Sequence, residues 1–484
     1  MNNNESSPNG EKHPFLNSSE TLDLQKLAQF LKNCDNDCCI IRLWHPKVVQ
    51  RSYGKEKRFF CPPPTIALFG HGWSLNKTKI SLNMSIYRQQ LQNAYTENDP
   101  PPSVEEEKRL RGLLSQIPDL PLRLHLNVGI NDGTTPFIVT IQDKVMAKSL
   151  FISSVDRRRY FKLGCEISEY LGPTTLYPAR FIGKFESSEI RVVSKPAKKQ
   201  NVRAADSAYV CLKSGMQVAL FNRARSQGIS TRYLHVEEPN FIASLDHWSS
   251  FYIYAVNTDE NSDSDKTFIS RQGVIYYNHV VRLVDVLTAS IIQFQVPILS
   301  HQAHESRDCV AWSITNCELI EFKFFEVMGP TNEPVSPIPF IKTAQLEGVQ
   351  EHNAIIEFSG TNLGPHLSVY FGLFSSTVIS ANSSNIRCRV PTVLELTQNS
   401  DMEIHTTTND GSYQFPISLI RKDGVVYPTD IEFLYSSYSA GEIGKIVFKS
   451  SLKFLDDPDE DEENVSQQLE ATFTEDEGEA EEVE

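Results

Sequence analysis

The sequence predicts an all-β protein made of several domains, and three observations support this prediction. Segments of alternating, β-branched and aromatic residues recur between turn residues, as in TIALFG (65–70), MQVALFN (216–222), SSFYIYAV (249–256) and LIEFKFFEV (319–327). A chain of 484 residues has room for about two to four domains that each bury a core. The composition, 40% hydrophobic and 22% charged, is typical of globular domains.

One helix is predicted near the N-terminus. In ETLDLQKLAQFLKN (20–33), the residues Leu24, Leu27 and Leu31 follow helical spacing. Residues 1–19 lack a secretory hydrophobic region, and we predict a disordered leader there. No apolar run approaches the roughly 18 residues that a membrane-spanning helix needs.

Two stretches interrupt the strand pattern. Residues 88–120 are charged and contain prolines, which indicates a loop insertion with one short helix at SVEEEKRLRGLLSQI (103–117). VMGPTNEPVSPIPF (327–340) has four prolines and indicates a linker. Short strands after it, such as AIIEFSGTNL (354–363) and IEFLYSS (431–437), predict one more sandwich.

Charge is distributed very unevenly along the chain. Residues 456–484 contain 15 acidic residues and no Lys or Arg, so we predict a disordered tail there. The net charge of −15 lies entirely in this tail, because the rest of the chain has 46 basic and 46 acidic residues. Residues 41–240 have a net charge of +13 and residues 241–455 one of −10. This division predicts a polyanion-binding unit in the N-terminal half.

The spacing of the cysteines argues against a metal site, and the absence of known catalytic motifs argues against an enzyme. Nine cysteines occur without CxxC pairs, which predicts reduced thiols in a cytosolic or nuclear protein. Cys34, Cys38 and Cys39 form the tightest group and have no matching His/Cys cluster, so a zinc site is the disfavoured alternative. The motifs of nucleotide-binding proteins, metalloproteases and α/β-hydrolases are absent from the sequence. We therefore predict no metal, no cofactor and no catalysis.

The segment YGKEKRFFCPPP (53–64) combines positive charge with apolar, stiff residues. Lys55, Lys57 and Arg58 precede two phenylalanines, a cysteine and three prolines. An edge strand carries such cations simply to discourage pairing with another chain. A two-stranded ribbon, however, fits the DNA major groove, where an arginine donates two hydrogen bonds to guanine. The cations cluster at the predicted tip of a ribbon, with an apolar anchor behind them, which favours DNA binding.

Three further segments are rich in cations. SKPAKKQNVR (194–203) contains four cations and no acid, and by itself it is equally typical of a solvated loop or a nuclear-import patch. FNRARSQGISTRYLHVE (221–237) mixes donors suited to phosphates with donors suited to base edges. DRRRYFK (156–162) is more typical of an ordinary surface. Together these segments predict a nucleic-acid partner, and a duplex is favoured because the aromatic residues flank the cations as packing groups.

Several longer stretches resemble one known family. The chain is similar, from about residue 20 to residue 436, to the CSL family, the Suppressor-of-Hairless-type transcription factors of the Notch pathway. The stretches that carry the resemblance are HPKVVQRSYGKEKRFFCPPP (45–64), VVSKPAKK (192–199), VALFNRARSQGISTRYLHVE (218–237), IIQFQ (291–295), VMGP (327–330) and LIRKDGVVY (419–427). The resemblance implies a nuclear protein that binds a GTGGGAA-type DNA site as a monomer.

The resemblance also implies a domain organisation. A Rel-homology-like Ig domain is expected over residues 20–235, a β-trefoil over 236–328 and an Ig-like IPT/TIG domain over 329–436. A disordered leader (1–19) and an acidic disordered tail (437–484) are expected on either side.

By the same resemblance, DNA-binding residues are expected in four places. Arg58 and Arg223 or Arg225 would read guanines, with help from Ser226 and Gln227. Phosphates would be bound by Lys57, Lys195, Lys198, Lys199 and Arg203. The remaining expected contacts are Gln50, Arg51, Ser52, Tyr53, Lys55, Ser249 and Ser250.

Protein partners are expected at the trefoil, which is shorter than in the family. The resemblance implies binding of the Notch intracellular domain, a Mastermind-type coactivator and corepressors, with Phe268, Ser270 and Gln293 at the peptide site. Here the chain passes from VVRLVDVLT (280–288) almost directly to IIQFQ, so close to one lobe of the trefoil is missing near residues 288–290. A barrel without this lobe would expose strand edges and apolar interior. The alternative function is therefore an interaction scaffold or dominant interferer that has lost productive Notch or DNA binding.

Overall fold

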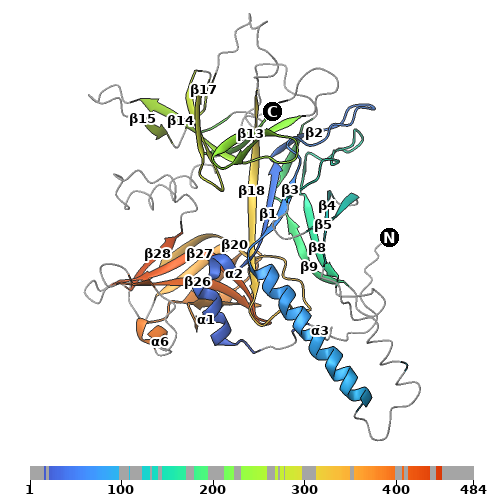
Figure 1. Ribbon diagram of the computed structural model, residues 1–484. Helices are drawn as coiled ribbons and strands as arrows, with labels where there is room; N and C mark the ends of the chain where they lie inside the picture. Colours follow the sequence, from blue (N-terminus) through green and yellow to red (C-terminus); the bar gives the residue numbers. More distant parts are fainter. Residues whose placement is uncertain are drawn as a thin grey trace, which may run out of the picture. The chain divides into compact units, whose positions relative to one another are not determined.

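The described part of the protein is mostly β structure with few helices, which confirms the all-β prediction (Figure 1). The computed structural model describes residues 16–17, 21–96, 108, 123–130, 133–139, 144–170, 179–193, 212–222, 231–258, 267–270, 273–276, 278–296, 312–348, 354–397, 406–407, 412–436 and 443–449. Among these residues no helix is both long and apolar enough to cross a membrane.

One long strand joins the three parts of the chain. Strand β18 (Ser313–Glu326) pairs along most of its length with β1 (Cys39–Pro46), from Cys39 opposite Phe324 to Pro46 opposite Cys317. At its start β18 pairs with β11 (Met216–Asn222), and at its end with β27 (Val425–Tyr435). Figure 1 shows β18 running between these groups of strands. The N-terminal part (residues 21–193), the middle part (212–296) and the C-terminal part (340–436) therefore share this strand.

The predicted N-terminal helix is confirmed. Helix α1 (Leu24–Lys32) begins at Asp23, whose carboxylate accepts hydrogen bonds from the backbone N–H groups of Gln25 and Lys26 at 3.0 and 3.3 Å. Its buried face includes Phe30, whose ring stacks on Phe325 of β18 with centroids 4.4 Å apart. The short helix α2 (Cys34–Asp37) follows and leads into β1.

A long helix after β3 (Thr65–Phe69) was not predicted. Helix α3 (Gly72–Thr96) follows this strand and runs into the stretch that we expected to be a loop insertion. Trp73, Ile80 and Met84 are buried, and this spacing of seven and four residues is a helical signal that the sequence analysis overlooked. The prediction of a loop is therefore wrong for residues 88–96, while the insertion itself stays a prediction. Nearly all of the predicted helix at 103–117 lies outside the described residues.

Small sheets complete the N-terminal part. Strands β5, β4, β8 and β9 form one sheet in that order, and β2 (Val48–Gln50), β10 and β7 form another. The strands not yet introduced are β4 (Arg123–Ile130), β5 (Gly133–Val139), β6 (Lys144–Met146), β7 (Tyr160–Phe161), β8 (Gly164–Tyr170), β9 (Arg180–Glu186) and β10 (Ile190–Val193).

The middle part contains a tight hairpin where we predicted a shortened trefoil. Strands β16 (Val280–Asp285) and β17 (Ile291–Gln295) pair antiparallel, and the carboxylate of Asp285 accepts the backbone N–H groups of Leu287 and Thr288 at 3.0 and 2.9 Å. The chain thus reverses direction within one short turn. The other strands of this part are β12 (Arg232–Glu237), β13 (Asn240–Ser244), β14 (Phe251–Thr258) and β15 (Thr267–Ser270).

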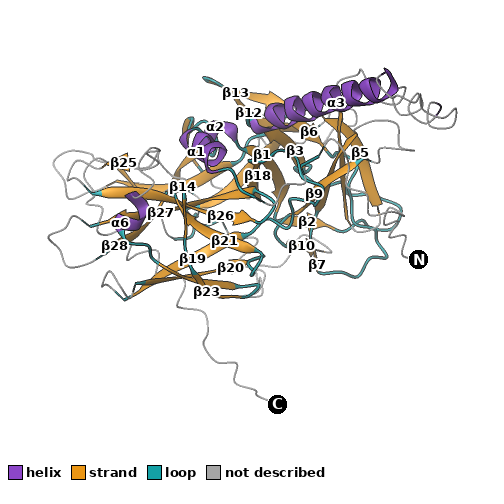
Figure 2. Cartoon of the chain, turned by 90° about the horizontal axis from the view of Figure 1, so that it is seen from below, coloured by secondary structure: helices purple, strands orange, loops and turns teal. Residues whose placement is uncertain are grey.

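The C-terminal part is a two-layer sandwich, as Figure 2 shows for β19, β20 and β23 against β21 and β26. Rings from both layers, including Phe358, Phe371 and Phe433, are fully buried between them. The elements are β19 (Phe340–Glu347), β20 (Ile355–Thr361), β21 (Leu367–Phe371), β22 (Phe374–Ser375), β23 (Val378–Ala381), β24 (Asn385–Arg389), α6 (Val393–Thr397), β25 (Thr406–Thr407), β26 (Tyr413–Arg421) and β28 (Gly444–Phe448).

Two segments predicted to be disordered contain ordered residues. Strand β28 begins in the predicted acidic tail, and Ile443 before it is buried in the core. In the predicted leader, Leu16 is buried, and the backbone N–H of Asn17 donates to the carbonyl of Pro330 at 2.7 Å. The prediction of disorder is wrong at these residues, because their backbone groups and apolar side chains have partners that are distant in sequence.

The predicted proline-rich linker is packed from both sides. We call residues 327–338 the strap. The backbone N–H of Val335 donates to the carbonyl of Ile182 at 2.7 Å, and the hydroxyl of Tyr427 donates to the carbonyl of Val335 at 2.7 Å. Arg421 donates to the carbonyl of Pro334 at 2.6 Å. Since Val335 is fully buried, this segment is part of the core between the N-terminal and C-terminal parts.

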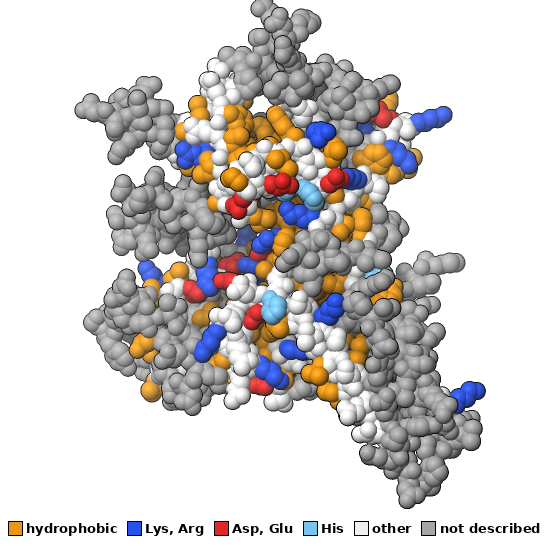
Figure 3. Space-filling model, viewed as in Figure 1, with side chains coloured by type: hydrophobic (Ala, Val, Ile, Leu, Met, Phe, Trp, Pro, Cys, Tyr) orange, Lys and Arg blue, Asp and Glu red, His pale blue; other side chains and the backbone are white. Residues whose placement is uncertain are grey.

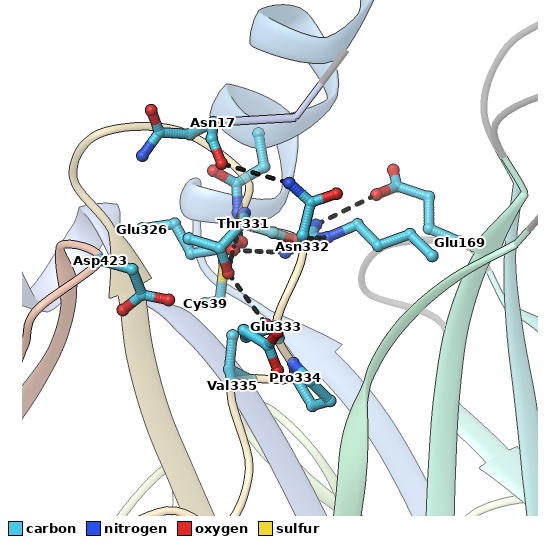
Figure 4. Close-up of polar contacts among 12 residues, drawn as sticks. Asn17, Cys39, Glu169, Glu326, Thr331, Asn332, Glu333, Pro334, Val335 and Asp423 are labelled. Carbon is cyan, nitrogen blue, oxygen red and sulfur yellow. Dashed lines mark hydrogen bonds and ion pairs between the residues drawn. The ribbon is translucent and has the colours of Figure 1, made fainter. Parts of the chain in front are cut away.

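A buried charge cluster lies beside the strap. Arg180 donates to Glu326 and, at 3.4 Å, to Glu169, and its Nε donates to the carbonyl of Thr331 at 3.0 Å. Glu326 also accepts the side-chain amide of Asn76 at 2.9 Å. Figure 4 shows Glu326 and Glu169 on either side of Thr331. The cluster joins β8, β9, β18, α3 and the strap.

Candidate nucleic-acid interface

The predicted DNA-reading segment leaves the sheet directly after residues whose backbone is hydrogen-bonded to two other segments. Strand β2 lies parallel to β10, with Val49 opposite Val192. The next backbone N–H, of Arg51, donates to the carbonyl of Val193 at 2.9 Å, and that of Ser52 donates to the carbonyl of Ile152 at 2.9 Å. These bonds define the direction in which the following residues leave the sheet.

Residues 53–56 form the tip of a tight hairpin, as expected for a ribbon. Tyr53 and Glu56 exchange backbone hydrogen bonds of 3.2 and 3.0 Å. Gly54 has a φ of +56°, a conformation that L-residues rarely adopt, which explains glycine at this position. Tyr53, Lys55 and Lys57 are exposed, so the tip presents its cations to solvent. Figure 3 shows Lys and Arg side chains at the upper right of the view, where the chain after β2 projects in Figure 1.

The phenylalanines anchor this hairpin. Phe60 is buried, stacks on Phe161 with centroids 5.6 Å apart, and donates its backbone N–H to the carbonyl of Leu150 at 3.0 Å. Phe59 meets Phe151 edge-on at 5.9 Å, and the ammonium of Lys57 lies 5.0 Å from the centre of the Phe151 ring. The apolar residues therefore hold the cations on a rigid base.

The two arginines of the hairpin differ in their surroundings. Arg51 donates to the carbonyl of Arg158 at 2.6 Å, so its guanidinium has a protein partner. Arg58 is 28% exposed, and its Nε lies 3.7 Å from the carboxylate of Glu56, which is too long for a hydrogen bond. Its backbone N–H donates to the hydroxyl of Ser52 at 3.0 Å. The hydrogen bond to Ser52 thus fixes the backbone of Arg58, while its guanidinium has no short hydrogen bond to a described residue.

Arg158, in the basic segment that we assigned to an ordinary surface, is neutralised internally. The carboxylate of Asp156 accepts its guanidinium at 2.6–3.1 Å through several hydrogen bonds. These bonds from Arg158 lower the pKa of Asp156 below its usual value. Arg158 therefore helps to orient Arg51 through its backbone and is less suited to bind a phosphate.

The middle part supports the hairpin from behind. The indole N–H of Trp248 donates to the carbonyl of Pro63 at 3.0 Å and to the hydroxyl of Thr65 at 2.9 Å. Trp248 is buried in a cluster that also contains Trp44 and Cys317. The sequence analysis missed Trp248, Phe151 and Phe161, because no local pattern links these residues to the hairpin. Only the folded chain brings them together.

The other two predicted DNA-binding loops follow strands β10 and β11, of which β10 ends against the hairpin segment. Strand β10 ends at Val193, whose carbonyl accepts Arg51, and the loop with Lys195, Lys198, Lys199 and Arg203 begins at the next residue. Strand β11 ends at Asn222, at the same end of β18 where Lys47 donates its backbone N–H to Asn316 at 3.1 Å. Both loops themselves, including Arg223, Arg225, Ser226 and Gln227, lie outside the described residues.

Ser249 and Ser250, which were predicted to contact DNA, are buried and not exposed at the surface. The hydroxyl of Ser249 accepts the backbone N–H of Val236 at 3.1 Å and lies 3.0 Å from His235 Nδ1. Ser250 is 2% exposed, and its hydroxyl lies 3.4 Å from Gln217 and from Cys317. Because their hydroxyls make internal contacts, we do not include these two residues in the DNA contacts proposed below.

The predicted peptide-binding residues lie on two strands of one sheet. Phe268 and Ser270 belong to β15 and are paired with Asn257 and Ala255 of β14, although their side chains lie outside the described set. Gln293 belongs to β17, on the other side of β16, and its amide oxygen accepts Arg282 at 3.2 Å. The pairing order is β15–β14–β16–β17, so two strands separate β15 from β17, and the three positions share one sheet without lying on adjacent strands.

Three family models match the chain in sequence order. They are "LAG1, DNA binding" over residues 41–206, "Beta-trefoil DNA-binding domain" over 237–311 and "TIG domain" over 338–435. This set and order of domains is that of the CSL proteins. The chain belongs to the CSL family. It is a DNA-binding transcription factor with double-stranded DNA as its partner, and not an enzyme.

Curated relatives agree with this family. The CSL chain is 29% identical over 471 residues to the mouse "Recombining binding protein suppressor of hairless-like protein", an alignment that covers 86% of this chain and 83% of the mouse protein. The human protein of the same name is 28% identical over 450 residues, covering 82% and 79%. "Transcription factor cbf11" of Schizosaccharomyces pombe is 26% identical over 247 residues, covering 51% of this chain and 33% of the yeast protein.

Proposed function

We propose that this CSL-family protein acts in the nucleus as a Notch-pathway transcription factor that recognises a GTGGGAA-type site. The observation that carries the proposal is the anchored hairpin, which presents Lys55, Lys57 and Arg58 on a base of buried aromatic residues. A rigid, cationic two-stranded tip has the width and charge to enter a major groove.

The proposed contacts divide into two kinds. Arg58 reads a guanine, because its guanidinium is partly exposed and its backbone is bound to Ser52. Lys55 and Lys57 bind phosphates, because point charges on flexible stems suit the DNA backbone. The loops at residues 194–203 and 223–228 are proposed to add phosphate and base contacts. The first loop follows Val193, whose carbonyl accepts the backbone N–H of Arg51, and the second follows β11, which pairs with the start of β18. The domain boundaries given above are part of this proposal.

Sequence preference of the Arg58→Ala variant tests the proposal. One bidentate arginine–guanine contact discriminates against a wrong base by about 1–3 kcal/mol, so the variant should lose that preference in gel-shift titrations with GTGGGAA and scrambled duplexes. Lys184→Ala is the matched control, because Lys184 is an exposed cation outside the hairpin, paired with Glu186 at 2.9 Å. Unchanged preference in Arg58→Ala would contradict the assignment.

A second function is favoured by the tight β16–β17 hairpin. Ile291, at the start of β17, is 52% exposed, and Figure 3 shows hydrophobic side chains at the surface in the upper part of the view, where Figure 1 places β14 and β17. A protein with this altered middle part is proposed to bind DNA without productive assembly of the Notch intracellular domain, a Mastermind-type coactivator or corepressors, and so to act as a scaffold or dominant interferer. Binding assays with a Notch-derived peptide distinguish the two functions.

A further inference from the structure

Two cysteines lie in contact beside helix α1. The Sγ atoms of Cys34 and Cys38 are 3.8 Å apart, and the backbone N–H of Cys38 donates to the carbonyl of Cys34 at 3.2 Å. The two residues are therefore on the same side of one helical turn. Cys34 is half-buried, whereas Cys38 is 1% exposed.

The third cysteine of this group belongs to a different cluster. Cys39 is fully buried in the main core, and its sulfur accepts the side-chain amide of Asn76 at 3.7 Å. Cys38 instead packs with Leu27 and Phe30 of α1 and with Phe325 of β18. Cys38 at the end of α2 and Cys39 at the start of β1 thus belong to different clusters, which leaves Cys34 and Cys38 as a pair. No group of three or more metal-ligating side chains was found within the described ranges.

We propose that Cys34 and Cys38 form an oxidisable dithiol that a hydroperoxide converts to an intramolecular disulfide. Closing the bond brings the sulfurs from 3.8 Å to about 2.05 Å. The turn that must adjust is short and outward-facing, because Asp35 and Asn36 between the cysteines are exposed.

The two cysteines have different roles in this step. Cys34 is the more accessible, so its thiolate attacks one peroxide oxygen, breaks the O–O bond and becomes a sulfenic acid, while the other oxygen leaves as hydroxide and is protonated to water. Cys38 then attacks the sulfur of Cys34 and expels hydroxide, which takes the thiol proton of Cys38 and leaves as a second water. Two thiols and one hydrogen peroxide thus give one disulfide and two waters.

The surroundings of Cys38 explain this order. Its hydrogen bond with Cys34 and its burial both raise the pKa of the Cys38 thiol. Cys34, which is more exposed than Cys38, is therefore the thiol that a peroxide reaches first. Cys38 lies where α1, β18 and the first residues of the strap meet in one apolar cluster. Oxidation therefore acts on the attachment of the N-terminal helix and not on the DNA-reading hairpin.

Peroxide treatment of the full chain followed by peptide mapping tests the proposal. Treatment with hydrogen peroxide should produce a peptide in which Cys34 is linked to Cys38, and a thiol reductant should remove the link. Cys61→Ser, which changes another half-buried cysteine, should leave the linked peptide unchanged. Cys34→Ser should abolish it. A wild-type chain in which these two cysteines remain thiols, or pair with other cysteines, would overturn the proposal.

The Cys38→Ser variant tests the order of the two steps. Without Cys38 the sulfenic acid on Cys34 has no resolving thiol, so dimedone should label Cys34 in this variant and not in the wild-type chain. Dimedone labelling of Cys34 to the same extent in both proteins would show that Cys38 does not resolve the intermediate. Circular dichroism should first show that the two proteins are equally folded. Labelling at Cys34 then reports the presence of the resolving thiol and not a difference in folding stability.

Discussion

Replacing Arg180 by methionine should destabilise the protein more than any single surface change. Arg180 is 2% exposed and lies between two carboxylates, of which Glu326 is fully buried and Glu169 is 6% exposed. Methionine fills similar volume but provides no charge and no donor. The change therefore leaves two acidic groups in the core without their cation, and the carbonyl of Thr331 loses its Arg180 donor.

The magnitude follows from the cost of an uncompensated buried charge. Removing one partner of a buried ion pair typically costs about 3–5 kcal/mol. The matched control lies on the same strand: Lys184 pairs with Glu186 at 2.9 Å, but their side chains are 50% and 44% exposed. An exposed pair of this kind contributes about 0–1 kcal/mol, so Lys184→Met should be nearly neutral.

Urea unfolding followed by tryptophan fluorescence measures the difference. Trp73 at the start of α3 packs against Phe324 near this cluster and is a suitable reporter. We expect the Arg180→Met variant to unfold at a clearly lower urea concentration, with hydrogen exchange increased in the strap. Equal midpoints for Arg180→Met and Lys184→Met would refute the view that this cluster stabilises the junction between the N-terminal and C-terminal parts.

Two further predictions concern other parts of the chain. Phe60→Ala should lower the free energy of unfolding by about 3–5 kcal/mol, because the ring is buried against Phe161. The variant should also bind DNA more weakly in fluorescence anisotropy. Wild-type affinity in a folded variant would contradict the anchoring role. The hydrogen bond from Arg389 lowers the pKa of Glu395 to about 2, so the stability from this pair is present above pH 4.5 and is lost as the pH falls toward about 2. Glu395→Gln should therefore flatten the acid limb of the stability profile in thermal unfolding, and an unchanged limb would contradict this.

Local patterns were sufficient for some elements and misleading for others. Leu24, Leu27 and Leu31 predicted α1 because an amphipathic helix shows its buried face directly in the residue spacing. The prolines of the strap indicated a linker, although Val335 is fully buried. Proline content reports only backbone stiffness, and a stiff segment becomes core when two domains supply hydrogen-bond partners on both sides.

For the candidate site, the sequence by itself determined the chemistry. The cations and the apolar residues behind them follow from residue types in order, since charge and hydrophobicity are properties of each side chain. The family follows from the resemblance of several longer stretches to known proteins. The tertiary structure alone decided which groups act together. Ser249 and Ser250 lie inside, Trp248 reaches Pro63 from 185 residues away, and Cys34 faces Cys38 rather than Cys39. Burial and contact depend on how distant segments pack, and no local pattern encodes that packing.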